Sequence, residues 1–296
     1  MAASIIDGRA IADAIRGEVR QASDRLTSTR GITPGLAFIL VGENPASQAY
    51  VRMKGKGCEE AGFYSVTERL HESVSEGEVL RMIDRFNLDP RIHGILVQLP
   101  LPPHIREARV IRAIDFKKDV DGFHPVNVGR LVIGRPCLRP CTPLGIQELL
   151  IRSGIETAGR HVVVIGRSNI VGKPVANLLL QKGKGANAVV TVVHSAAGDL
   201  SRFTLQADIL IAAMGRARFV TAGMVKEGAA VIDVGINRIS DPTAKSGYRI
   251  VGDVDYDGVC PKAGHITPVP GGVGPMTIAM LLGNTLSAAA GTLYDD

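Results

Sequence analysis

Short apolar runs alternate with longer amphipathic stretches along the first hundred residues, and this alternation predicts strands and helices in turn. Residues 35–41 are apolar without a break, as is typical of a strand buried on both faces of a parallel sheet. Residues 45–62 carry a proline near their start and a glycine at their end, which frame a helix. The series continues with strand 64–70, helix 76–86 and strand 93–98, and an amphipathic helix precedes it with apolar positions Ile5, Ile6, Ile11, Ile15 and Val19. The first half of the chain therefore favours an α/β fold with a parallel sheet.

From residue 115 to 143 the periodicity weakens and glycine and proline become frequent, which predicts a long functional loop or a linker. A domain boundary is expected near Pro140. A second alternating series follows, with helices at 143–153, 172–181 and 199–206 and strands at 161–165, 188–193, 208–212 and 229–233. The pattern predicts a first domain at 1–140, a second at 141–275, and a C-terminal helical segment at 276–296 that returns to the first domain.

Composition narrows the functional classes. The 296 residues contain 34 Lys and Arg and 29 Asp and Glu, and the resulting net charge of +5 makes no case for nucleic acid. Aromatic residues make up 4% of the chain, too few for a protein that stacks single-stranded bases on aromatic rings. The longest apolar stretch, 277–294, is interrupted by Asn284, Thr285 and Ser287, so it predicts a packed helix rather than a membrane span.

The N-terminal residues and the cysteines indicate a cytoplasmic protein. Charged residues between Asp7 and Arg16 break any apolar signal segment. None of the four cysteines stands in C-x-x-C spacing, which favours reduced thiols in a cytosol. Cys137 and Cys141 are the pair that could share a metal, but no histidine or second cysteine pair completes such a site, so no metal is expected.

A turn between a strand and a helix is the strongest local motif. The predicted strand 161–165 ends at Gly166, and the next helix begins near Gly172. Backbone N–H groups at such a turn, together with the helix dipole, favour a pyrophosphate. Ser168 stands where the dinucleotide fingerprint usually has its second glycine, so a tight turn without a ligand is the alternative.

The end of the following strand indicates which dinucleotide is bound. NAD enzymes place an acidic residue there, on the ribose hydroxyls, but this chain has Val193-His194-Ser195. Arg167 lies in the loop and can face a 2′-phosphate, with Ser195 as a further donor. This pattern favours NADP over NAD. The alternatives are an exposed surface charge for Arg167 and a helix N-cap for Ser195.

Polar residues of the first domain are placed for chemistry. Tyr50 and Lys54 lie four residues apart and share one face of the predicted helix, where the lysine suits general acid–base work; a surface lysine beside an unrelated tyrosine is the alternative. Gln98 follows an apolar strand, at the edge where parallel sheets bind ligands, and is therefore well placed to contact a ligand. The alternative is an amide that caps the strand end. Asp121 lies in the loop between the domains, in Lys118-Asp-Val-Asp121-Gly, where two acids could bind a metal, a ligand amidine or solvent.

Five ordered motifs carry a resemblance to a known family. They are Gly42-Glu-Asn-Pro-Ala-Ser47-Gln-Ala-Tyr50-Val-x-x-Lys54, Val97-Gln98-Leu-Pro-Leu-Pro102, Lys118-Asp-Val-Asp121-Gly, Gly166-Arg-Ser168 and Pro268-Val-Pro-Gly-Gly-Val-Gly-Pro-Met-Thr277. The chain resembles the bifunctional methylenetetrahydrofolate dehydrogenase/methenyltetrahydrofolate cyclohydrolase family over nearly its whole length. The resemblance implies two α/β domains, an N-terminal catalytic domain with a parallel sheet and a Rossmann NADP-binding domain, with a cleft between them, in a homodimer.

The same resemblance implies an activity and residue roles. Members oxidise methylenetetrahydrofolate with NADP and hydrolyse the methenyl product to 10-formyltetrahydrofolate, in one-carbon metabolism and purine biosynthesis. Lys54 is implied as the general acid–base group of hydrolysis, Tyr50 as the residue that orders this lysine and stacks on the folate, and Gln98 as a support for the lysine and the reacting carbon. Asp121 is implied to hydrogen-bond the pterin. The other implied contacts are Ser47, Pro102, Gly271, Gly272 and Thr277 for the folate and Gly166, Arg167, Ser168, Ser195 and Ile236 for the cofactor.

One departure from the family pattern concerns the 2′-phosphate. Members commonly follow the His-Ser with a basic or polar residue and a threonine, whereas Ala196, Ala197 and Gly198 stand here and leave Arg167 and Ser195 with less help. The alternative function is a monofunctional NAD(P)-dependent dehydrogenase of the same fold, which an assay of methenyl hydrolysis distinguishes. A non-enzymatic protein would bind NADP without turnover. Tetrahydrofolate derivatives are the expected partners, with no nucleic acid and no membrane.

Overall fold

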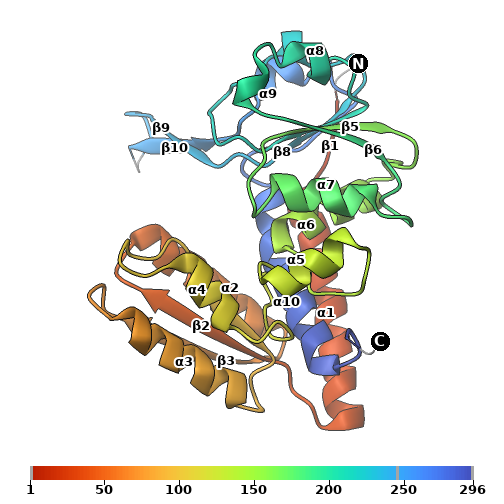
Figure 1. Cartoon of the computed structure of the whole chain (residues 1–296). Coiled ribbons are helices and arrows are strands. Elements are labelled where there is room, and N and C mark those ends of the chain that lie inside the picture. The colour runs from red at the N-terminus through yellow and green to blue at the C-terminus, as the bar shows by residue number, and fades with distance from the viewer. Residues whose placement is uncertain (1–2, 245–246, 295–296) are drawn as a thin grey trace. The chain divides into compact units, whose positions relative to one another are not determined.

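The computed structural model describes residues 3–244 and 247–294 of the chain. It divides into two compact units, each built from two segments. Met1–Ala12 and Thr142–Thr277 form the six-stranded unit, and Asp13–Cys141 and Ile278–Asp296 form the three-stranded unit. Figure 1 shows both units.

The three-stranded unit has a parallel sheet in the order β3-β2-β4. Its strands are β2 (Gly35–Val41), β3 (Tyr64–Leu70) and β4 (Gly94–Val97), and its helices include α2 (Pro45–Glu60), α3 (Glu76–Leu88), α4 (Glu107–Ala113) and α5 (Pro125–Val132). All seven residues of β2 are buried. On one face of the sheet, Ile39 of β2 and Ile83 of α3 belong to the same hydrophobic cluster. Burial of all seven residues, on both faces of the sheet, explains why the central strand is apolar along its whole length. The predicted parallel sheet is confirmed.

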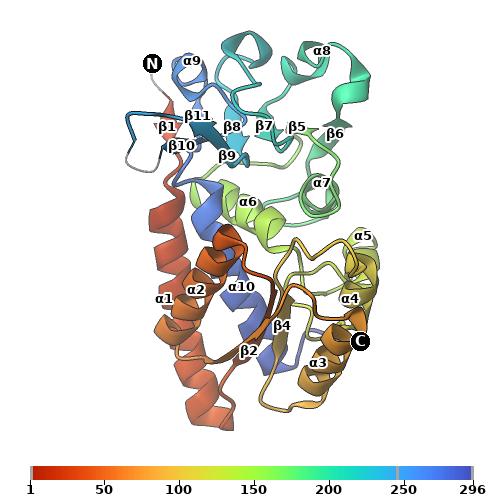
Figure 2. The same cartoon turned by 90° about the vertical axis from the view of Figure 1, so that its left-hand side faces the viewer.

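The six-stranded unit contains a wholly parallel sheet in the order β1-β11-β8-β7-β5-β6. Figure 2 shows these strands side by side. They are β1 (Ser4–Ile5), β5 (His161–Ile165), β6 (Val189–Val193), β7 (Ile209–Ala212), β8 (Ala230–Asp233) and β11 (His265–Ile266). The helices of this part of the chain are α6 (Cys141–Arg152), α7 (Gly172–Leu180), α8 (Ser201–Thr204) and α9 (Tyr256–Val259), and β9 (Asn237–Ser240) pairs antiparallel with β10 (Tyr248–Val251). This is the expected dinucleotide-binding architecture.

Two long helices each contribute residues to both units. They are α1 (Gly8–Arg30) and α10 (Val273–Ala290). The structure differs here from the sequence prediction, which placed Ile5 and Ile6 in the opening helix and assigned residues 1–140 to one domain. Ile5 instead lies in β1 and pairs with Ile266 of β11, so the first described residues join the six-stranded sheet. Asp295 and Asp296, at the end of the predicted segment 276–296, lie outside the described residues.

The loop predicted between residues 115 and 143 is not without structure. It contains α5, which begins at Pro125 and is capped by His124, whose ring nitrogen accepts a hydrogen bond from the Val126 N–H at 3.1 Å. Proline is well suited to the first helical position because its missing N–H would be unpaired there. The glycines within and after this helix hid its periodicity in the sequence.

The C-terminal helix α10 is, among the described residues, the one helix long and apolar enough to cross a membrane by length and composition. Half of its apolar stretch is buried inside the protein, and the core helix of a globular protein meets the same criteria. Its polar residue Asn284 is buried and donates hydrogen bonds to the carbonyls of Val120 and Arg139, both at 2.8 Å. Residues 278–294 therefore pack as part of the three-stranded unit.

Candidate active site

Helix α2 places a lysine on its buried face. Asn44 caps the helix by accepting hydrogen bonds from the N–H groups of Ala46 and Ser47, and Pro45 stands at its first turn. The buried positions recur at helical spacing, and they are Ser47, Val51, Lys54, Gly57 and Cys58. Lys54 therefore occupies a position in the apolar stripe, and only 8% of it is exposed. A buried lysine needs a polar partner.

That partner is the glutamine at the carboxyl end of β4. Lys54 Nζ donates a hydrogen bond to Gln98 Oε1 at 3.1 Å. The amide nitrogen of Gln98 donates to the Leu99 carbonyl at 2.8 Å, which turns the amide oxygen toward the lysine. The structure thus brings together two residues that the sequence separates by 44 positions, and it places them at the edge where parallel sheets bind ligands.

Asp121 lies beside the end of β4. A small cavity of about 20 Å³ has Val97, Leu99 and Asp121 in its wall. Burial raises the pKa of the Asp121 carboxyl, the Lys54 cation opposes this rise, and the Asp119 charge adds to it. The Cys141 thiol lies 3.9 Å from Asp121 Oδ1. Lys54, Gln98 and Asp121 therefore form one cluster at the carboxyl edge of the three-stranded sheet.

The neighbouring acid, Asp119, has a structural role. Its Oδ2 accepts hydrogen bonds from the His124 N–H at 2.7 Å and from the Asn127 amide at 2.9 Å. The Tyr294 hydroxyl in turn donates to Asn127 Oδ1 at 2.6 Å. This network holds the turn that carries Asp121, and Asp119 has no capacity left for a ligand at that oxygen.

The other predicted folate contacts of this unit lie close in sequence to the cluster. Ser47 is buried on α2, and Pro102 is part-buried in the loop after β4. Tyr50 is 41% exposed. In the described part of the chain, the hydrogen-bond partner of Lys54 is Gln98 and not Tyr50. The predicted ordering of the lysine by Tyr50 is therefore not seen, since the ring lies on the exposed flank of α2.

The six-stranded unit has a topological switch point at β5. The chain moves from β5 to β6 on one side and then to β7 on the other, and open α/β sheets bind ligands at such a crevice. Gly166 follows β5, and a Cβ there would lie 2.2 Å from the Ala213 carbonyl oxygen after β7. A Cβ on Gly172 would lie 2.1 Å from the Gly166 carbonyl oxygen. Both positions therefore require glycine, and this close turn fits a dinucleotide pyrophosphate.

Ser168 caps the helix after this turn. Its hydroxyl oxygen accepts hydrogen bonds from the N–H groups of Val171 at 3.1 Å and Gly172 at 3.3 Å. The hydroxyl hydrogen remains free of these two bonds and can donate to an anion. The predicted contact with the cofactor phosphates is thus compatible with the cap but stays a prediction.

The predicted phosphate-binding pair follows two neighbouring strands. Ile165 of β5 is paired in register with Val193 of β6, so Arg167 and Ser195 each stand two residues beyond a paired position. Both are exposed. His194 caps the short turn after β6, because its ring nitrogen accepts a hydrogen bond from the Ala196 N–H at 3.3 Å. The alternative interpretation of Ser195 as the cap is therefore wrong. Ile236, the predicted nicotinamide contact, is exposed after β8.

Three predicted folate contacts lie in the six-stranded unit, whereas Lys54 lies in the three-stranded unit. They are Gly271, Gly272 and Thr277. A Cβ on Gly8 would lie 1.9 Å from the Gly272 carbonyl oxygen, so this glycine turn is packed closely against the start of α1. Local packing therefore accounts for the tight turn, and the ligand role of these residues stays a prediction.

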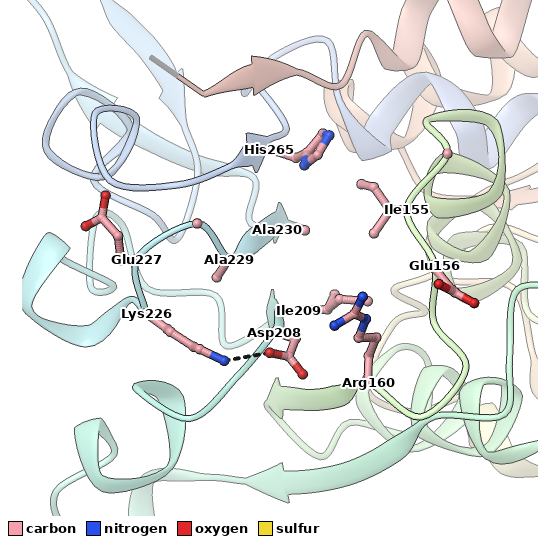
Figure 3. A pocket seen from close by; sticks show the side chains of 12 residues that line it. Ile155, Glu156, Arg160, Asp208, Ile209, Lys226, Glu227, Ala229, Ala230 and His265 are labelled. Carbon is pink, nitrogen blue, oxygen red and sulfur yellow. Dashed lines mark hydrogen bonds and ion pairs between the residues drawn. The ribbon is translucent and has the colours of Figure 1, made fainter. Parts of the chain in front are cut away.

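A larger cavity, of about 450 Å³, opens at the opposite edge of the six-stranded sheet, where its strands begin. Figure 3 shows Arg160 and Glu156 on one side of it and His265 across from them. Asp208 is already paired there with Lys226 at 2.6 Å and with the His161 N–H at 3.0 Å. Because ligands of such sheets bind at the carboxyl ends of the strands, this cavity is not the dinucleotide site.

Within residues 3–244 and 247–294, no three His, Cys, Asp or Glu side chains are grouped as a metal site. Sequence reasoning missed two buried acids, Asp233 and Asp253, which lie behind the loops of the dinucleotide edge. The signal that could have found them is a glycine near each: Asp233-Val-Gly235 and Gly252-Asp253.

A parallel sheet with a glycine turn at its switch point, and a second α/β unit with a buried lysine bonded to a glutamine, define a two-domain dinucleotide-dependent enzyme. Residues 6–121 match the family model of the tetrahydrofolate dehydrogenase/cyclohydrolase catalytic domain. Residues 140–293 match the NAD(P)-binding domain of the same family. The chain belongs to the tetrahydrofolate dehydrogenase/cyclohydrolase family.

Proteins of this family match the chain over nearly its whole length. The bifunctional protein FolD of Chlorobium luteolum is 60% identical over 284 residues, which are 95% of this chain and 96% of that protein. The crystal structure of the bifunctional FolD enzyme from Campylobacter jejuni is 49% identical with a TM-score of 0.92, covering 99% of this chain and 100% of the other. The FolD of Trypanosoma brucei, solved with NADP cofactor and inhibitor, is 42% identical with a TM-score of 0.92 and 99% coverage of both chains.

Family membership identifies the activity. The chain is a bifunctional methylenetetrahydrofolate dehydrogenase and methenyltetrahydrofolate cyclohydrolase, with tetrahydrofolate derivatives as substrates. The predicted family, fold and nicotinamide cofactor are confirmed. The monofunctional alternative has no support from the similar proteins at high identity.

Proposed function

We propose that this chain oxidises methylenetetrahydrofolate with NADP and hydrolyses the methenyl product, with Lys54 as the proton carrier of the hydrolysis. The observation that carries this proposal is the part-buried hydrogen bond of 3.1 Å from Lys54 Nζ to Gln98 Oε1. A lysine held in one position by an oriented amide, at the carboxyl edge of a parallel sheet, is placed for general acid–base work.

The hydrolysis adds water to a cationic methenyl carbon. The attacking water gives one proton to Lys54 Nζ as its oxygen bonds to the methenyl carbon. When the bond from that carbon to the ring nitrogen breaks, the ring nitrogen takes a proton, and the new hydroxyl loses its proton as the formyl carbonyl forms. One proton is therefore released to solvent for each turnover. Gln98 keeps the lysine nitrogen in place throughout. Proton transfer by a positioned side chain typically contributes about 10²- to 10⁴-fold to a rate.

The substrate is held through its pterin by Asp121 in this proposal. The amino-pyrimidine edge of a pterin offers adjacent N–H donors, and one carboxylate can accept both. Asp119 and Asn127 hold the turn, which leaves Asp121 available for the ligand. Tyr50, with 41% of its surface exposed, offers an aromatic face on which the folate can stack.

The oxidation requires alignment rather than an acid or a base of the protein. NADP, when bound, supplies the hydride acceptor. Gly166 and Gly172 leave room for the backbone of the dinucleotide turn, and Arg167 and Ser195 are the donors proposed for the 2′-phosphate. The NADP named in the Trypanosoma brucei relative supports the same preference here.

We further propose a cytoplasmic homodimer that supplies formyltetrahydrofolate for purine biosynthesis, with no nucleic-acid or membrane partner. The free thiols are compatible with a reducing compartment. β6 is an edge strand of its sheet, and it exposes Val189 and Val192. Such an apolar edge is well suited to cover by a second copy. Light scattering coupled to gel filtration should give twice the monomer mass, and a monomer at micromolar concentration would contradict the dimer.

Separate assays of the two reactions test the role of Lys54. Lys54→Gln should lower the hydrolysis of added methenyltetrahydrofolate by about 10²- to 10⁴-fold and leave much of the dehydrogenase rate, because only hydrolysis needs the proton carrier. Lys56→Gln is a matched control two residues further along α2, where the lysine is exposed and pairs with Glu60 at 3.6 Å. Equal loss of both activities in a folded Lys54→Gln protein would refute the role.

A further inference from the structure

Two buried aspartates face each other behind the loops at the carboxyl edge of the six-stranded sheet. Asp233 ends β8 and is 3% exposed, and Asp253 follows β10 and is fully buried. The Asp253 N–H donates to Asp233 Oδ1 at 2.8 Å, so the second aspartate is fastened directly to the first. Neither residue has a role in the chemistry described above.

The carboxylate of Asp253 connects two loops. Its Oδ2 accepts hydrogen bonds from the N–H groups of Met214 at 2.7 Å and Gly215 at 2.8 Å, in the loop after β7. Its Oδ1 accepts from the side-chain amide of Asn237 at 2.9 Å, in the segment after β8. Asn237 is the neighbour of Ile236 in the chain.

The carboxylate of Asp233 holds the base of the same arrangement. Its Oδ1 accepts from the Gly235 N–H at 2.9 Å as well as from Asp253, and its Oδ2 accepts from the Val254 N–H at 2.9 Å. Every hydrogen-bond partner that the described residues give to the two carboxylates is a neutral N–H group. Each carboxylate accepts three such bonds, and these six N–H donors offset the desolvation of two acids.

Two glycines make room for these carboxylates. A Cβ on Gly235 would lie 2.3 Å from Asp253 Oδ1, and a Cβ on Gly252 would lie 1.7 Å from Asp233 Oδ2. Each aspartate thus packs against a glycine beside the other. Burying two acids side by side lowers the stability of a fold. Arrangements of this kind are expected at functional sites, and this pair lies beside the loops of the dinucleotide edge.

We propose that Asp253, supported by Asp233, is a positioning residue for the dinucleotide, because it fixes the loop after β7 and the segment around Ile236 at a set spacing. The loop after β7 also supplies the Ala213 carbonyl against which Gly166 is packed. The Asp253 carboxylate therefore fixes one wall of the crevice at the switch point, the loop after β7, and ties it to the segment after β8. The inference rests on the proposed placement of NADP at this edge.

The test compares cofactor binding with a reaction that uses no cofactor. Calorimetric titration with NADP should give a dissociation constant about 10- to 100-fold higher for Asp253→Ala than for the wild type, as expected when charge-assisted bonds that order a site are lost. KM for NADP should rise in parallel. Hydrolysis of added methenyltetrahydrofolate should stay within about two-fold, because it does not involve the dinucleotide.

A second variant covers the risk that Asp253→Ala does not fold. Asp253→Asn retains an amide oxygen for the N–H groups of Met214 and Gly215, and Asn237 can turn its own amide to match. NADP affinity should fall by about three- to ten-fold in this variant. The matched control is Asp208→Asn, at the amino edge of the same sheet, which should leave NADP affinity unchanged.

Each outcome decides the proposal. Unchanged NADP affinity in a folded Asp253→Asn protein overturns the positioning role, as does a parallel loss of hydrolysis and of cofactor binding, which would indicate a purely structural residue. If the wild type itself does not bind NADP in the calorimeter, the proposed cofactor preference fails instead. A rise in the NADP dissociation constant with intact hydrolysis supports the positioning role.

Discussion

Replacing Asp233 by asparagine should remove a pH-dependent contribution to the stability of the protein. Burial raises the pKa of Asp233 from 3.8 to about 6. The hydrogen bonds that its carboxylate accepts from three backbone N–H groups oppose this rise, whereas the charge of Asp253 adds to it. Between these two pH values the folded protein holds a proton at this site that the unfolded chain has lost. The folded state is therefore favoured at low pH, and this contribution is lost as the pH rises through about 6.

The magnitude follows from the two pKa values. One pKa unit corresponds to about 1.4 kcal/mol, so the full contribution of Asp233 is about 3 kcal/mol. On lowering the pH from about 7.5 to about 5, roughly 1.4 kcal/mol of it should be recovered. The asparagine variant cannot titrate at this position. The difference in free energy of unfolding between wild type and variant should therefore shift by roughly 1.4 kcal/mol in favour of the wild type at the lower pH.

Urea unfolding followed by circular dichroism at the two pH values measures this difference directly. Carboxylates far from this pair titrate in both proteins and cancel. Asp208→Asn is the control, because Lys226 lowers the pKa of Asp208 and keeps that side chain ionised at both pH values. A wild-type minus variant difference that stays constant to within about 0.5 kcal/mol would refute the reasoning on burial.

Two further predictions concern binding. Arg167→Ala should raise KM for NADP by about 10- to 100-fold and leave NAD use little changed, because a charge-assisted contact to the 2′-phosphate is lost; equal changes with both cofactors would make Arg167 structural. Asp121→Ala should lower kcat/KM of both reactions by roughly 10- to 1000-fold without changing NADP affinity, since both reactions use the same bound pterin. Near-normal kinetics of Asp121→Asn would instead assign Asp121 to the turn.

The sequence was informative wherever a pattern is local. The continuous apolar run of β2 predicts a strand buried on both faces, and the glycine turn at Gly166 predicts a dinucleotide edge. The spacing of Tyr50 and Lys54 predicts a shared helix, but spacing alone does not show that the lysine lies on the buried stripe and the tyrosine on the exposed flank. That distinction depends on how α2 packs.

Features that depend on distant partners were not predictable. β1 and β11 are two residues long, so they carry no periodicity and are recognised as strands only by their pairing. Asp119 and Asp121 look equivalent in the sequence, and only the bonds from His124 and Asn127 distinguish the acid that is fixed in the turn. Asp233 and Asp253 are held mostly by backbone N–H groups, so the glycines beside them are the only trace of this arrangement in the sequence.

The most direct test of the assignment of Lys54 is a single progress curve with methylenetetrahydrofolate and NADP, in which NADPH and the methenyl intermediate are followed together by absorbance. The wild type should form NADPH while the methenyl intermediate stays low, because the same chain hydrolyses it. In Lys54→Gln the intermediate should accumulate in step with NADPH. If NADPH forms in the variant and the intermediate stays as low as in the wild type, Lys54 is not the proton carrier of the hydrolysis.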